Sequence, residues 1–270
     1  MNKYRARQMN ASTRRKPRIH TTSKKRVCRF RHKYCLCILC RKPNDIYIDF
    51  LSTFTKYDIY IIIDDNSICY KEKYARFSKI NIIQMNNEEC KKRGFKKMTL
   101  HAELTAWDKA MYYFSTLNTT YNKVWFLEDD VFFYNEETLL TIDSKYKNSD
   151  LLTNNYSENK NGDNHGWYWN KIDIKFPPPY YCTMACAMRI SSALLSKIKD
   201  YANKHNTLFF FEALFPTICK MNHMKYDTPP EFKNIVHIKN YHDTDFNKYE
   251  LFHPVKDIRK QKHYRDNFSK

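Results

Sequence analysis

Residues 124–133 read VWFLEDDVFF, an apolar run that is interrupted by three consecutive carboxylates. The apolar and aromatic residues over 123–127 predict a buried strand that runs directly into the acidic triplet. Unpaired carboxylates at a buried strand end are costly, because desolvation and mutual repulsion both oppose their charges. In an extended chain Glu128 and Asp130 project to the same side, and Asp129 points elsewhere. Glu128 and Asp130 are therefore the residues that we expect to share a divalent cation.

Oxygen ligands of this kind favour Mg²⁺ or Mn²⁺, and such ions keep coordination positions free for phosphate oxygens. The alternative is a solvated acidic turn after a strand. Aromatic residues flank the triplet on both sides: Trp125, Phe126, Phe132 and Phe133. These neighbours make a simple exposed turn the poorer explanation, so we predict a metal site at the end of this strand.

Strand-like and helix-like segments alternate on both sides of this stretch. Apolar or β-branched runs predict further strands at 34–40, 57–63, 80–85, 150–153 and 181–190. Helical periodicity or helix-start residues predict helices at 46–54, 101–117, 136–146, 191–202 and 216–221. The alternation predicts an α/β fold with a mostly parallel central sheet flanked by helices. In open sheets of this kind, ligands bind outside the carboxyl ends of the strands, where the acidic triplet falls.

The composition excludes two common nucleotide-binding motifs and concentrates the charge in one segment. The chain has 270 residues and only three glycines, so neither G-x-G-x-x-G nor G-x-x-x-x-G-K-[ST] is present. The formal net charge is +18, and residues 1–33 carry thirteen Lys or Arg and no acid. We predict that 1–33 is a basic disordered tail, with nucleic acid, anionic lipid or an acidic protein as the candidate partner. The alternative is a solvated extension without a partner.

One group of cysteines lies close to two histidines near the first predicted strand: Cys28, Cys35, Cys37 and Cys40, with His20 and His32. Metal binding is one interpretation of this group. The other is a buried strand with Cys35 and Cys37 on one face and Cys40 on the opposite face, where cysteine is a small core residue. We favour the core interpretation, because no second cysteine pair stands at zinc spacing, and we extend it to Cys182 and Cys186.

The apolar strand, the acidic triplet and the apolar residues after it resemble the D-x-D region of GT-A-type glycosyltransferases, here in an E-x-D form. Other segments are similar to motifs of these enzymes in order and spacing: Arg41–Asn44, Asp64–Asn66, Ala106–Ala110, Phe211–Pro216 and His253–Lys256. The resemblance covers about residues 34–256 and does not single out one characterised family. It implies a GT-A fold, which is a Rossmann-like nucleotide-sugar transferase fold.

This resemblance implies a metal-dependent transfer of a sugar from a nucleoside-diphosphate sugar, expected to be a UDP-sugar, to a hydroxyl of a glycan, protein or lipid acceptor. The metal ion, Mn²⁺ or Mg²⁺, would be held by Glu128, Asp130 and His253. His237 and His242 are rival candidates for the histidine ligand. The donor would be bound by residues at the strand ends, on the helix before the triplet and near the C-terminus: Pro43, Asp64, Asp65, Asn66, Asp108 and Lys256.

Glu212 is the expected catalytic base of an inverting hexosyl or hexosaminyl transfer. It is the single acid in the apolar stretch 208–218, so it must be paired, protonated or facing a cleft. Pro216 fits the first turn of a helix, which places Glu212 at or just before a helix N-terminus. The alternative is an ordinary acid at the start of a helix. Trp167 and Trp169 either stack on a sugar ring or pack into the fold.

The expected organisation is a single GT-A-like catalytic domain over 34–260, followed by a C-terminal tail at 261–270. Residues 34–133 would be its nucleotide- and metal-binding half, and residues 134–260 its acceptor half. No apolar run is long enough for a transmembrane helix, and no apolar segment of a signal peptide follows the basic start. We therefore expect a cytoplasmic protein.

Two other functions fit the same residues. A divalent-metal-dependent nuclease or nucleotidyltransferase would use the acidic triplet and the basic tail, with Asp64 and Asp65 as carboxylates for a second metal. A non-catalytic nucleic-acid-binding protein on a transferase fold is the third hypothesis. The mild charge of the chain beyond residue 33 and the lack of a Gly-rich nucleotide loop favour the glycosyltransferase.

Overall fold

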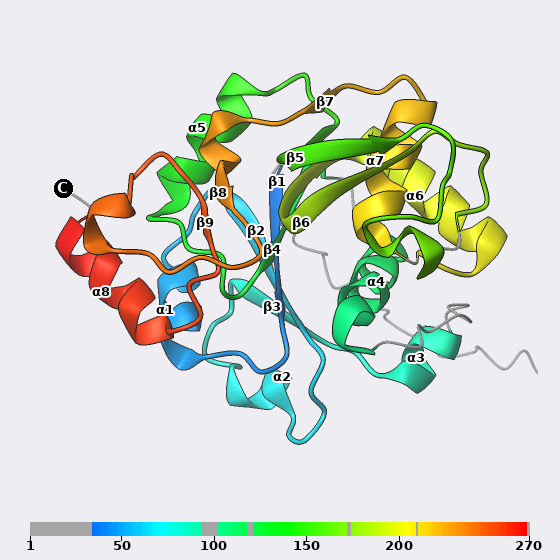
Figure 1. Ribbon diagram of the computed structural model, residues 1–270. Helices are drawn as coiled ribbons and strands as arrows, with labels where there is room; N and C mark the ends of the chain where they lie inside the picture. The colour runs from blue at the N-terminus through cyan, green and yellow to red at the C-terminus, as the bar shows by residue number, and fades with distance from the viewer. Residues whose placement is uncertain (1–33, 93–101, 118–120, 172–173, 209, 269–270) are drawn as a thin grey trace, which may run out of the picture. The chain divides into compact units, whose positions relative to one another are not determined.

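A seven-stranded sheet is the centre of the computed structural model, which describes residues 34–92, 102–117, 121–171, 174–208 and 210–268. The strand order is β3-β2-β1-β4-β6-β5-β7 (Figure 1). The strands are β1 (Tyr34–Cys40), β2 (Tyr57–Ile63), β3 (Ile80–Gln84), β4 (Lys123–Glu128), β5 (Leu151–Asn159), β6 (Tyr180–Ser191) and β7 (Tyr226–Asp227). Within this sheet only β6 runs against its neighbours. The predicted fold class, α/β with a mostly parallel sheet, is confirmed.

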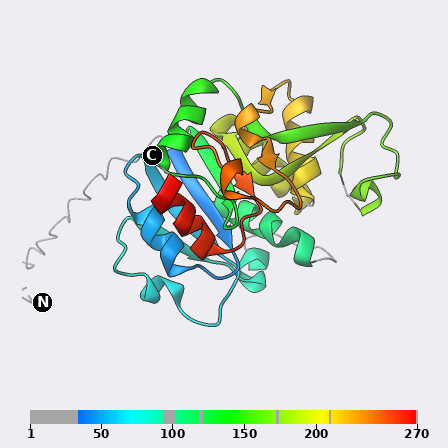
Figure 2. The same ribbon diagram turned by 60° about the vertical axis from the view of Figure 1, so that its left-hand side comes forward.

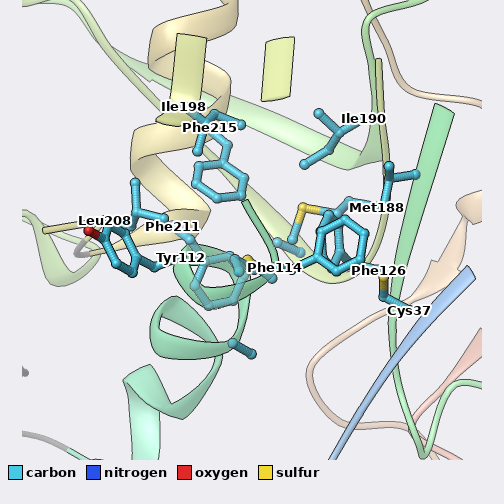
Figure 3. Close-up of a cluster of buried hydrophobic side chains, with 14 of the residues drawn as sticks. Cys37, Tyr112, Phe114, Phe126, Met188, Ile190, Ile198, Leu208, Phe211 and Phe215 are labelled. Carbon is cyan, nitrogen blue, oxygen red and sulfur yellow. The ribbon is translucent and has the colours of Figure 1, made fainter. Parts of the chain in front are cut away.

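Helices cover both faces of this sheet (Figure 1). Their bounds are α1 (Asp45–Ser52), α2 (Tyr70–Lys73), α3 (Asn87–Lys92), α4 (Ala102–Ser115), α5 (Glu136–Lys145), α6 (Ser192–His205), α7 (Phe211–Met221) and α8 (Ile258–Phe268). On one face, α4, α6 and α7 pack onto the strands through a cluster in which Phe114 and Phe215 lie near Phe126 (Figure 3). On the other face, α1 and α5 contribute Ile48 and Leu139 to a second cluster.

Both faces of β1 are buried, which explains its nearly continuous apolar sequence. Cys35 and Cys37 belong to the cluster on the α4 side, and Cys40 belongs to the cluster on the α1 side. The predicted distribution of these cysteines over the two faces is confirmed, and all three are core residues. Cys28 and the rest of the predicted tail, 1–33, lie outside the described residues.

Residues 261–268 of the segment that we predicted to be a tail belong to helix α8. This helix lies beside α1 (Figure 2), and the Arg265 guanidinium stands 3.7 Å from the centre of the Phe50 ring. Gln261 is fully buried and donates to the backbone oxygens of Asp129 and Val255, at 3.1 and 2.9 Å. The sequence of α8 is polar, and its packing depends on polar side chains that bond backbone carbonyls, so hydrophobic periodicity did not reveal it.

Regular structure also forms in two segments for which neither a strand nor a helix was predicted. Helix α3 forms within the segment 87–98, and β5 continues beyond the predicted 150–153 as far as Asn159. The extension of β5 is polar, but it pairs with β6, as with Ser157 opposite Cys182. Strand formation here depends on the partner strand and not on local apolar residues, so the sequence did not predict it.

Helix α7 begins earlier than predicted. Its first residue is Phe211, so Glu212 lies in the first turn, and Pro216 lies in the helix interior. The prediction that Pro216 occupies the first turn was therefore wrong. Residues 213–219 of this helix are all buried, and burial of so many apolar side chains outweighs the unfavourable helix propensity of proline.

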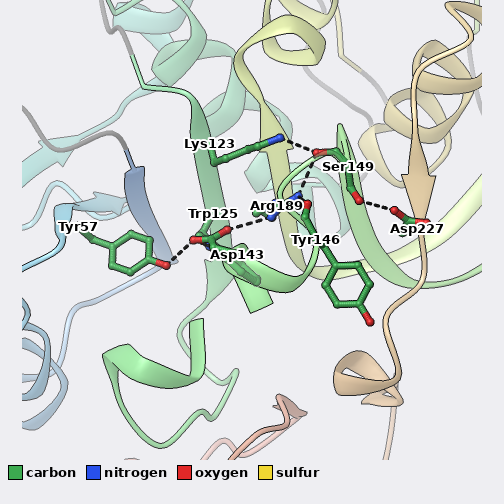
Figure 4. Close-up of polar contacts among 8 residues, drawn as sticks. All are labelled: Tyr57, Lys123, Trp125, Asp143, Tyr146, Ser149, Arg189 and Asp227. Atoms are coloured by element: carbon green, nitrogen blue, oxygen red, sulfur yellow. Dashed lines mark hydrogen bonds and ion pairs between the residues drawn. The ribbon is translucent and has the colours of Figure 1, made fainter. Parts of the chain in front are cut away.

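A buried ion pair joins α5 to β6 (Figure 4). The Arg189 guanidinium donates to Asp143 Oδ1 at 3.0 Å, and Tyr57 and Trp125 donate to Asp143 Oδ2 at 2.5 and 3.2 Å. Arg189 also donates to the backbone oxygens of residues 146 and 149, at 2.7 and 3.0 Å. Both oxygens of the buried carboxylate therefore have donors, as a structural charge requires.

Candidate functional site

The acidic triplet lies where the strand order of the sheet changes direction. The chain passes from β1 to β2 and β3 on one side of β1 and then returns to β4 on its other side. In open α/β sheets the ligand crevice forms at such a switch point, outside the carboxyl ends of the strands. Residues 41–44 follow β1 at this point, Glu128 ends β4, and the Asp129 amide donates to the Leu39 carbonyl at 3.1 Å.

A pocket of about 730 Å³ opens at this switch point, a size that suits a small-molecule ligand. Its walls come from the segment after β1, from α1, from the triplet and from the start of α8: Ile38, Cys40, Arg41, Lys42, Pro43, Asn44, Tyr47, Ile48, Ile61, Asp129, Asp130, Lys256 and Ile258. Two of the predicted donor-binding residues, Pro43 and Lys256, thus line the same pocket as Asp130. Its basic residues, Arg41, Lys42 and Lys256, give it groups that attract phosphate.

The C-terminal segment delivers a histidine to the triplet. Strand β9 (Phe252–His253) pairs with β8 (Asn234–Ile235), and the backbones of Phe132 and Phe252 exchange hydrogen bonds of 2.8 and 2.9 Å. The Val255 amide donates to the Asp130 carbonyl at 2.8 Å. As a result His253 Nε2 lies 3.2 Å from Asp130 Oδ1 and 3.6 Å from Glu128 Oε2. The structure therefore brings together the three residues predicted to hold the metal.

The ring of His253 is oriented for ligation through Nε2. Its Nδ1 lies 2.7 Å from the Val236 carbonyl oxygen, which only accepts, so Nδ1 carries a proton and Nε2 faces the carboxylates. A histidine that donates its other ring N–H to a backbone carbonyl is the usual arrangement at protein metal sites. Burial by itself would lower the pKa of His253, but contacts with Asp130, Cys186 and Glu128 raise that pKa well above the usual range. In the metal-free protein a proton on Nε2 therefore balances the acids.

The polar atoms of this cluster fit a divalent cation. Asp130 Oδ1 is buried and, within the described residues, has no hydrogen bond of acceptable geometry, although His253 is close to it. Two donors held at about 2.1 Å by a tetrahedral ion lie about 3.4 Å apart, close to the distances from His253 Nε2 to the two carboxylates. Oxygen and imidazole donors around an unsatisfied buried carboxylate are a suitable donor set for Mn²⁺ or Zn²⁺.

Cys186 on β6 completes a cluster that the sequence analysis did not anticipate. The ligand atoms of Glu128, Cys186 and His253 all lie within 4.8 Å of one another. We had assigned this cysteine to the core, and it is indeed buried, but it also lies against the candidate metal ligands. No local signal reveals this position, because it results from the antiparallel pairing of β6 with β4.

Glu212 lies close enough to the cluster to interact with it electrostatically. Its Oε1 accepts a hydrogen bond from the Ala185 amide at 3.4 Å. Burial raises the pKa of Glu212 to about 7, the hydrogen bond from Ala185 lowers it, and the charge of Glu128 raises it further. A carboxylate with a pKa near neutrality is suited to accept a proton at physiological pH.

Asp129, the middle residue of the triplet, also faces the pocket. It lines the pocket together with Asp130, and burial, followed by the charges of Asp130 and Glu128, raises its pKa to about 7. Repulsion among these carboxylates therefore contributes to the raised pKa of Asp129. A bound cation would relieve this repulsion in addition to filling the coordination sites.

Asp108, predicted to reach the donor sugar, is fully buried beside the start of α7. Its Oδ1 accepts a hydrogen bond from the Phe211 amide at 3.2 Å, and its Oδ2 has no partner in the described part of the chain. Burial raises the pKa of Asp108 well above its usual value. The contact with the N-terminus of α7 supports a role in positioning that helix, and hence Glu212 in its first turn.

The residues after β2, predicted to contact the nucleoside, are engaged with the protein. Asp64 forms an ion pair with Lys109. Asp65 accepts hydrogen bonds from the Ser67 and Tyr70 hydroxyls at 2.5 and 2.6 Å. Asn66 donates to the backbone oxygen of residue 85 at 2.7 Å. None of the three lines the pocket described above.

The remaining candidates differ in position. His237 and His242 are both exposed, and His242 caps the short 3₁₀ helix at 243–245. They therefore lie apart from the cluster that contains His253. Trp167 and Trp169 are half-buried and contact each other, with a ring-centre distance of 5.0 Å. Trp167 also contacts Phe210, which directly precedes α7, at 5.5 Å.

No protein family matches the chain, and no curated protein matches it by sequence. Solved structures to which it is similar include an active-site mutant of LgtC, with 12% identity over 86% of this chain and 95% of that one and a TM-score of 0.43. Another is a glycosyltransferase involved in the glycosylation of the major capsid of PBCV-1, with 13% identity over 85% and 99% and a TM-score of 0.41. A third is a 4-diphosphocytidyl-2C-methyl-D-erythritol synthase from Anaerococcus prevotii, with 10% identity over 72% and 86% and a TM-score of 0.39.

Among the described residues, no helix combines the length and the apolar character that crossing a bilayer requires.

Proposed function

We propose that this protein is a metal-dependent glycosyltransferase that uses a nucleoside-diphosphate sugar as donor. The observation that supports this most directly is the convergence of Glu128, Asp130 and His253 beside a basic pocket at the switch point of the sheet. A metal ion bound there would neutralise negative charge on the diphosphate leaving group. A pocket for a nucleotide, a cation site and a neighbouring acid of raised pKa are the parts that sugar transfer requires.

Three groups of residues have separate roles in the proposed reaction. Glu128, Asp130 and His253 hold the ion, and Arg41, Lys42 and Lys256 bind phosphate oxygens in the pocket. Glu212 accepts the proton of the acceptor hydroxyl, because it is partly desolvated, lies near the cluster and has a pKa of about 7. A base on the acceptor side supports an inverting transfer, which we assign to a hexosyl or hexosaminyl group carried by UDP.

The proposed catalytic unit combines both halves of the chain. Residues 34–133 supply the strand ends, the phosphate-binding residues and the acidic triplet, and residues 134–260 supply Glu212 and His253. Because Gln261 and Ile258 of α8 contact the site, we extend the unit to residue 268. The acceptor, a glycan, protein or lipid, would approach Glu212 from the side of the second half.

The contacts of Asp64 and Asp65 disfavour the alternative of a two-metal nuclease or nucleotidyltransferase. Two-metal enzymes hold ions about 4 Å apart with carboxylates from several elements. Here Asp64 is paired with Lys109, and Asp65 is hydrogen-bonded to two hydroxyls, so neither is available as a ligand without breaking those contacts.

Ligand-induced stabilisation tests the proposal. The melting temperature would be measured with Mn²⁺ in combination with UDP, GDP, CDP or single-stranded DNA. We expect a nucleoside diphosphate to stabilise the protein only when Mn²⁺ is present, because the ion held by Glu128, Asp130 and His253 would supply the positive charge that attracts the diphosphate. Asp130→Asn should abolish this effect without lowering the melting temperature of the free protein. Stabilisation by single-stranded DNA alone, or metal-independent binding of nucleotide, would contradict the proposal.

A further inference from the structure

Cys186 occupies a position that a core role does not explain. On β6, Ala187 stands opposite Leu127 of β4, so the next residue pair along these strands is Glu128 and Cys186, at the carboxyl end of β4. The Sγ atom lies within 4.8 Å of the ligand atoms of Glu128 and His253, in a location that is only 8% exposed. The thiol, the imidazole and the carboxylate thus converge on one point from three different strands.

We propose that Cys186 is a ligand of the metal ion at this site, so that the ion is held by a sulfur donor together with imidazole and carboxylate. The inference rests on the proposed metal centre and names a ligand and a metal preference for it. The donors Glu128, Cys186 and His253 approach one another closely, and Asp130 approaches His253 from the side of the pocket. Glu128, Cys186 and His253 thus form a three-donor set, and three protein ligands with a further position open are usual at catalytic zinc sites.

The nature of the donor atoms determines which ion the site prefers. Thiolate is a soft ligand that selects zinc and similar ions, whereas carboxylates alone suit Mg²⁺ and Mn²⁺. Coordination requires the thiolate form, so binding the ion breaks the S–H bond and releases the proton to solvent. A site with one sulfur, one nitrogen and carboxylate oxygens should therefore bind Zn²⁺ and Cd²⁺ more tightly than Mn²⁺ and should bind Mg²⁺ poorly.

A second cysteine of the same strand provides a matched control. Cys182 lies on β6 four residues earlier, is 7% exposed, and has the Ser157 hydroxyl as its neighbour at 3.0 Å. It does not belong to the cluster formed by Glu128, Cys186 and His253. Serine at either position removes one buried sulfur from the same strand, so a loss due to packing alone should be similar for the two variants.

The test is a titration of the metal-free full-length protein with Cd²⁺. The ultraviolet charge-transfer absorption of Cd²⁺–thiolate bonds is recorded at each addition. We expect Cys186→Ser to lose one such thiolate band, and Cys182→Ser to keep it. Removing groups that merely orient ligands costs about 10–100-fold in metal affinity, so loss of a ligand should weaken Zn²⁺ binding by at least about 100-fold. The affinity for Mn²⁺, measured by electron paramagnetic resonance, should fall much less.

Two outcomes would overturn the inference. Equal bands in the wild type and in Cys186→Ser would show that this thiol does not bind the ion. Equal losses of Zn²⁺ and Mn²⁺ affinity in Cys186→Ser and Cys182→Ser would show that a packing defect lowers the affinity. In that case Cys186→Ala, whose methyl group suits the apolar surroundings, would restore binding.

The same measurements separate this inference from the proposed function. If Mn²⁺-dependent UDP binding is present and the thiolate band is unchanged by Cys186→Ser, the ligand assignment fails and the transferase proposal stands. If the band depends on Cys186 but no nucleoside diphosphate binds, the thiol-containing metal site stands and the transferase proposal fails.

Discussion

Two clusters of buried charge in this protein differ in how far their polar atoms are satisfied. Around Asp143 both carboxylate oxygens have donors, from Arg189, Tyr57 and Trp125. At the end of β4, Asp130 Oδ1 has no hydrogen bond within the described residues. In the first cluster, which we call the Asp143 cluster, the protein itself supplies donors to both oxygens of the carboxylate. In the second, the triplet cluster of Glu128, Asp129, Asp130 and His253, the imidazole of His253 lies 3.2 Å from Asp130 Oδ1, and we propose that a cation binds here.

The comparison distinguishes structural from functional acids by a physical criterion. A structural carboxylate in the interior is stabilised by donors that offset its desolvation. A functional carboxylate keeps part of its coordinating capacity for another molecule and remains under strain until that molecule binds. Near the triplet, burial is the main cause that raises the pKa of Asp129 and of Glu212 to about 7.

The largest expected effect is on stability, in the Asp143 cluster. Asp143→Ala leaves the Arg189 guanidinium buried without its counter-ion, which should lower the free energy of unfolding by about 3–5 kcal/mol. Urea denaturation measures this loss. Asp130→Asn is the matched substitution in the triplet cluster and should leave the stability of the metal-free protein unchanged or slightly raised. Equal losses in the two variants would remove the distinction between the clusters.

The next effect is on turnover. Glu212→Gln keeps the shape of the side chain and removes its basicity, so we expect kcat to fall by about 100-fold or more. The Mn²⁺-dependent binding of UDP should remain near normal. Initial rates of sugar transfer or of donor hydrolysis provide the measurement. Near-normal turnover would exclude Glu212 as the base and would favour a retaining mechanism or another acid.

A smaller effect concerns the histidine ligand. His253→Ala should weaken Mn²⁺ binding by roughly 10–100-fold, because it removes a ligand and the contact that neutralises Asp130. His237→Ala and His242→Ala replace exposed histidines and serve as controls that should not change the affinity. Calorimetric titration with Mn²⁺ would measure the three variants. If a control variant loses affinity and His253→Ala does not, the histidine ligand is the substituted control residue and not His253.

The smallest effect is a dependence of stability on pH. The folded-state pKa of Glu212 is about 7, above the ordinary value of 4.5, so the native protein holds this proton more tightly than the unfolded chain does. The contribution of protonated Glu212 to the free energy of unfolding is therefore fully present below about pH 4.5 and is lost as the pH rises towards 7. In the metal-free protein, Glu212→Gln should become more stable relative to the wild type between about pH 5 and pH 8. A pH-independent difference between the two unfolding free energies would contradict the assigned pKa.

Local sequence was sufficient for those parts of the fold that depend on local burial. The strands β1, β2 and β4 are apolar on both faces, so their runs of β-branched and aromatic residues identified them. The acidic triplet was recognisable because carboxylates inside an apolar run conflict with burial. By contrast, the polar end of β5, the polar helix α8 and the start of α7 depend on partners elsewhere in the chain, and these were missed or misplaced.

The composition of the site required long-range contacts. Glu128 and Asp130 were identifiable from their own neighbours, because alternation along an extended chain places them on one side. His253 was named from the resemblance, and its position beside the triplet depends on the pairing of Phe252 with Phe132, more than a hundred residues earlier in the chain. Sequence spacing carries no information about such pairing, since residues far apart in the chain meet only through the packing of the whole sheet.

Cys186 is the clearest example of this division. As a residue of an apolar strand it is a typical core cysteine, and its sequence neighbours indicate nothing else. Its position is decided by the antiparallel register of β6 against β4 and by the parallel pairing of β8 with β9, which place its sulfur beside a carboxylate and an imidazole. Residue types and local periodicity determine which side chains are buried, whereas the pairing of strands determines which buried side chains meet, and a metal site depends on that meeting.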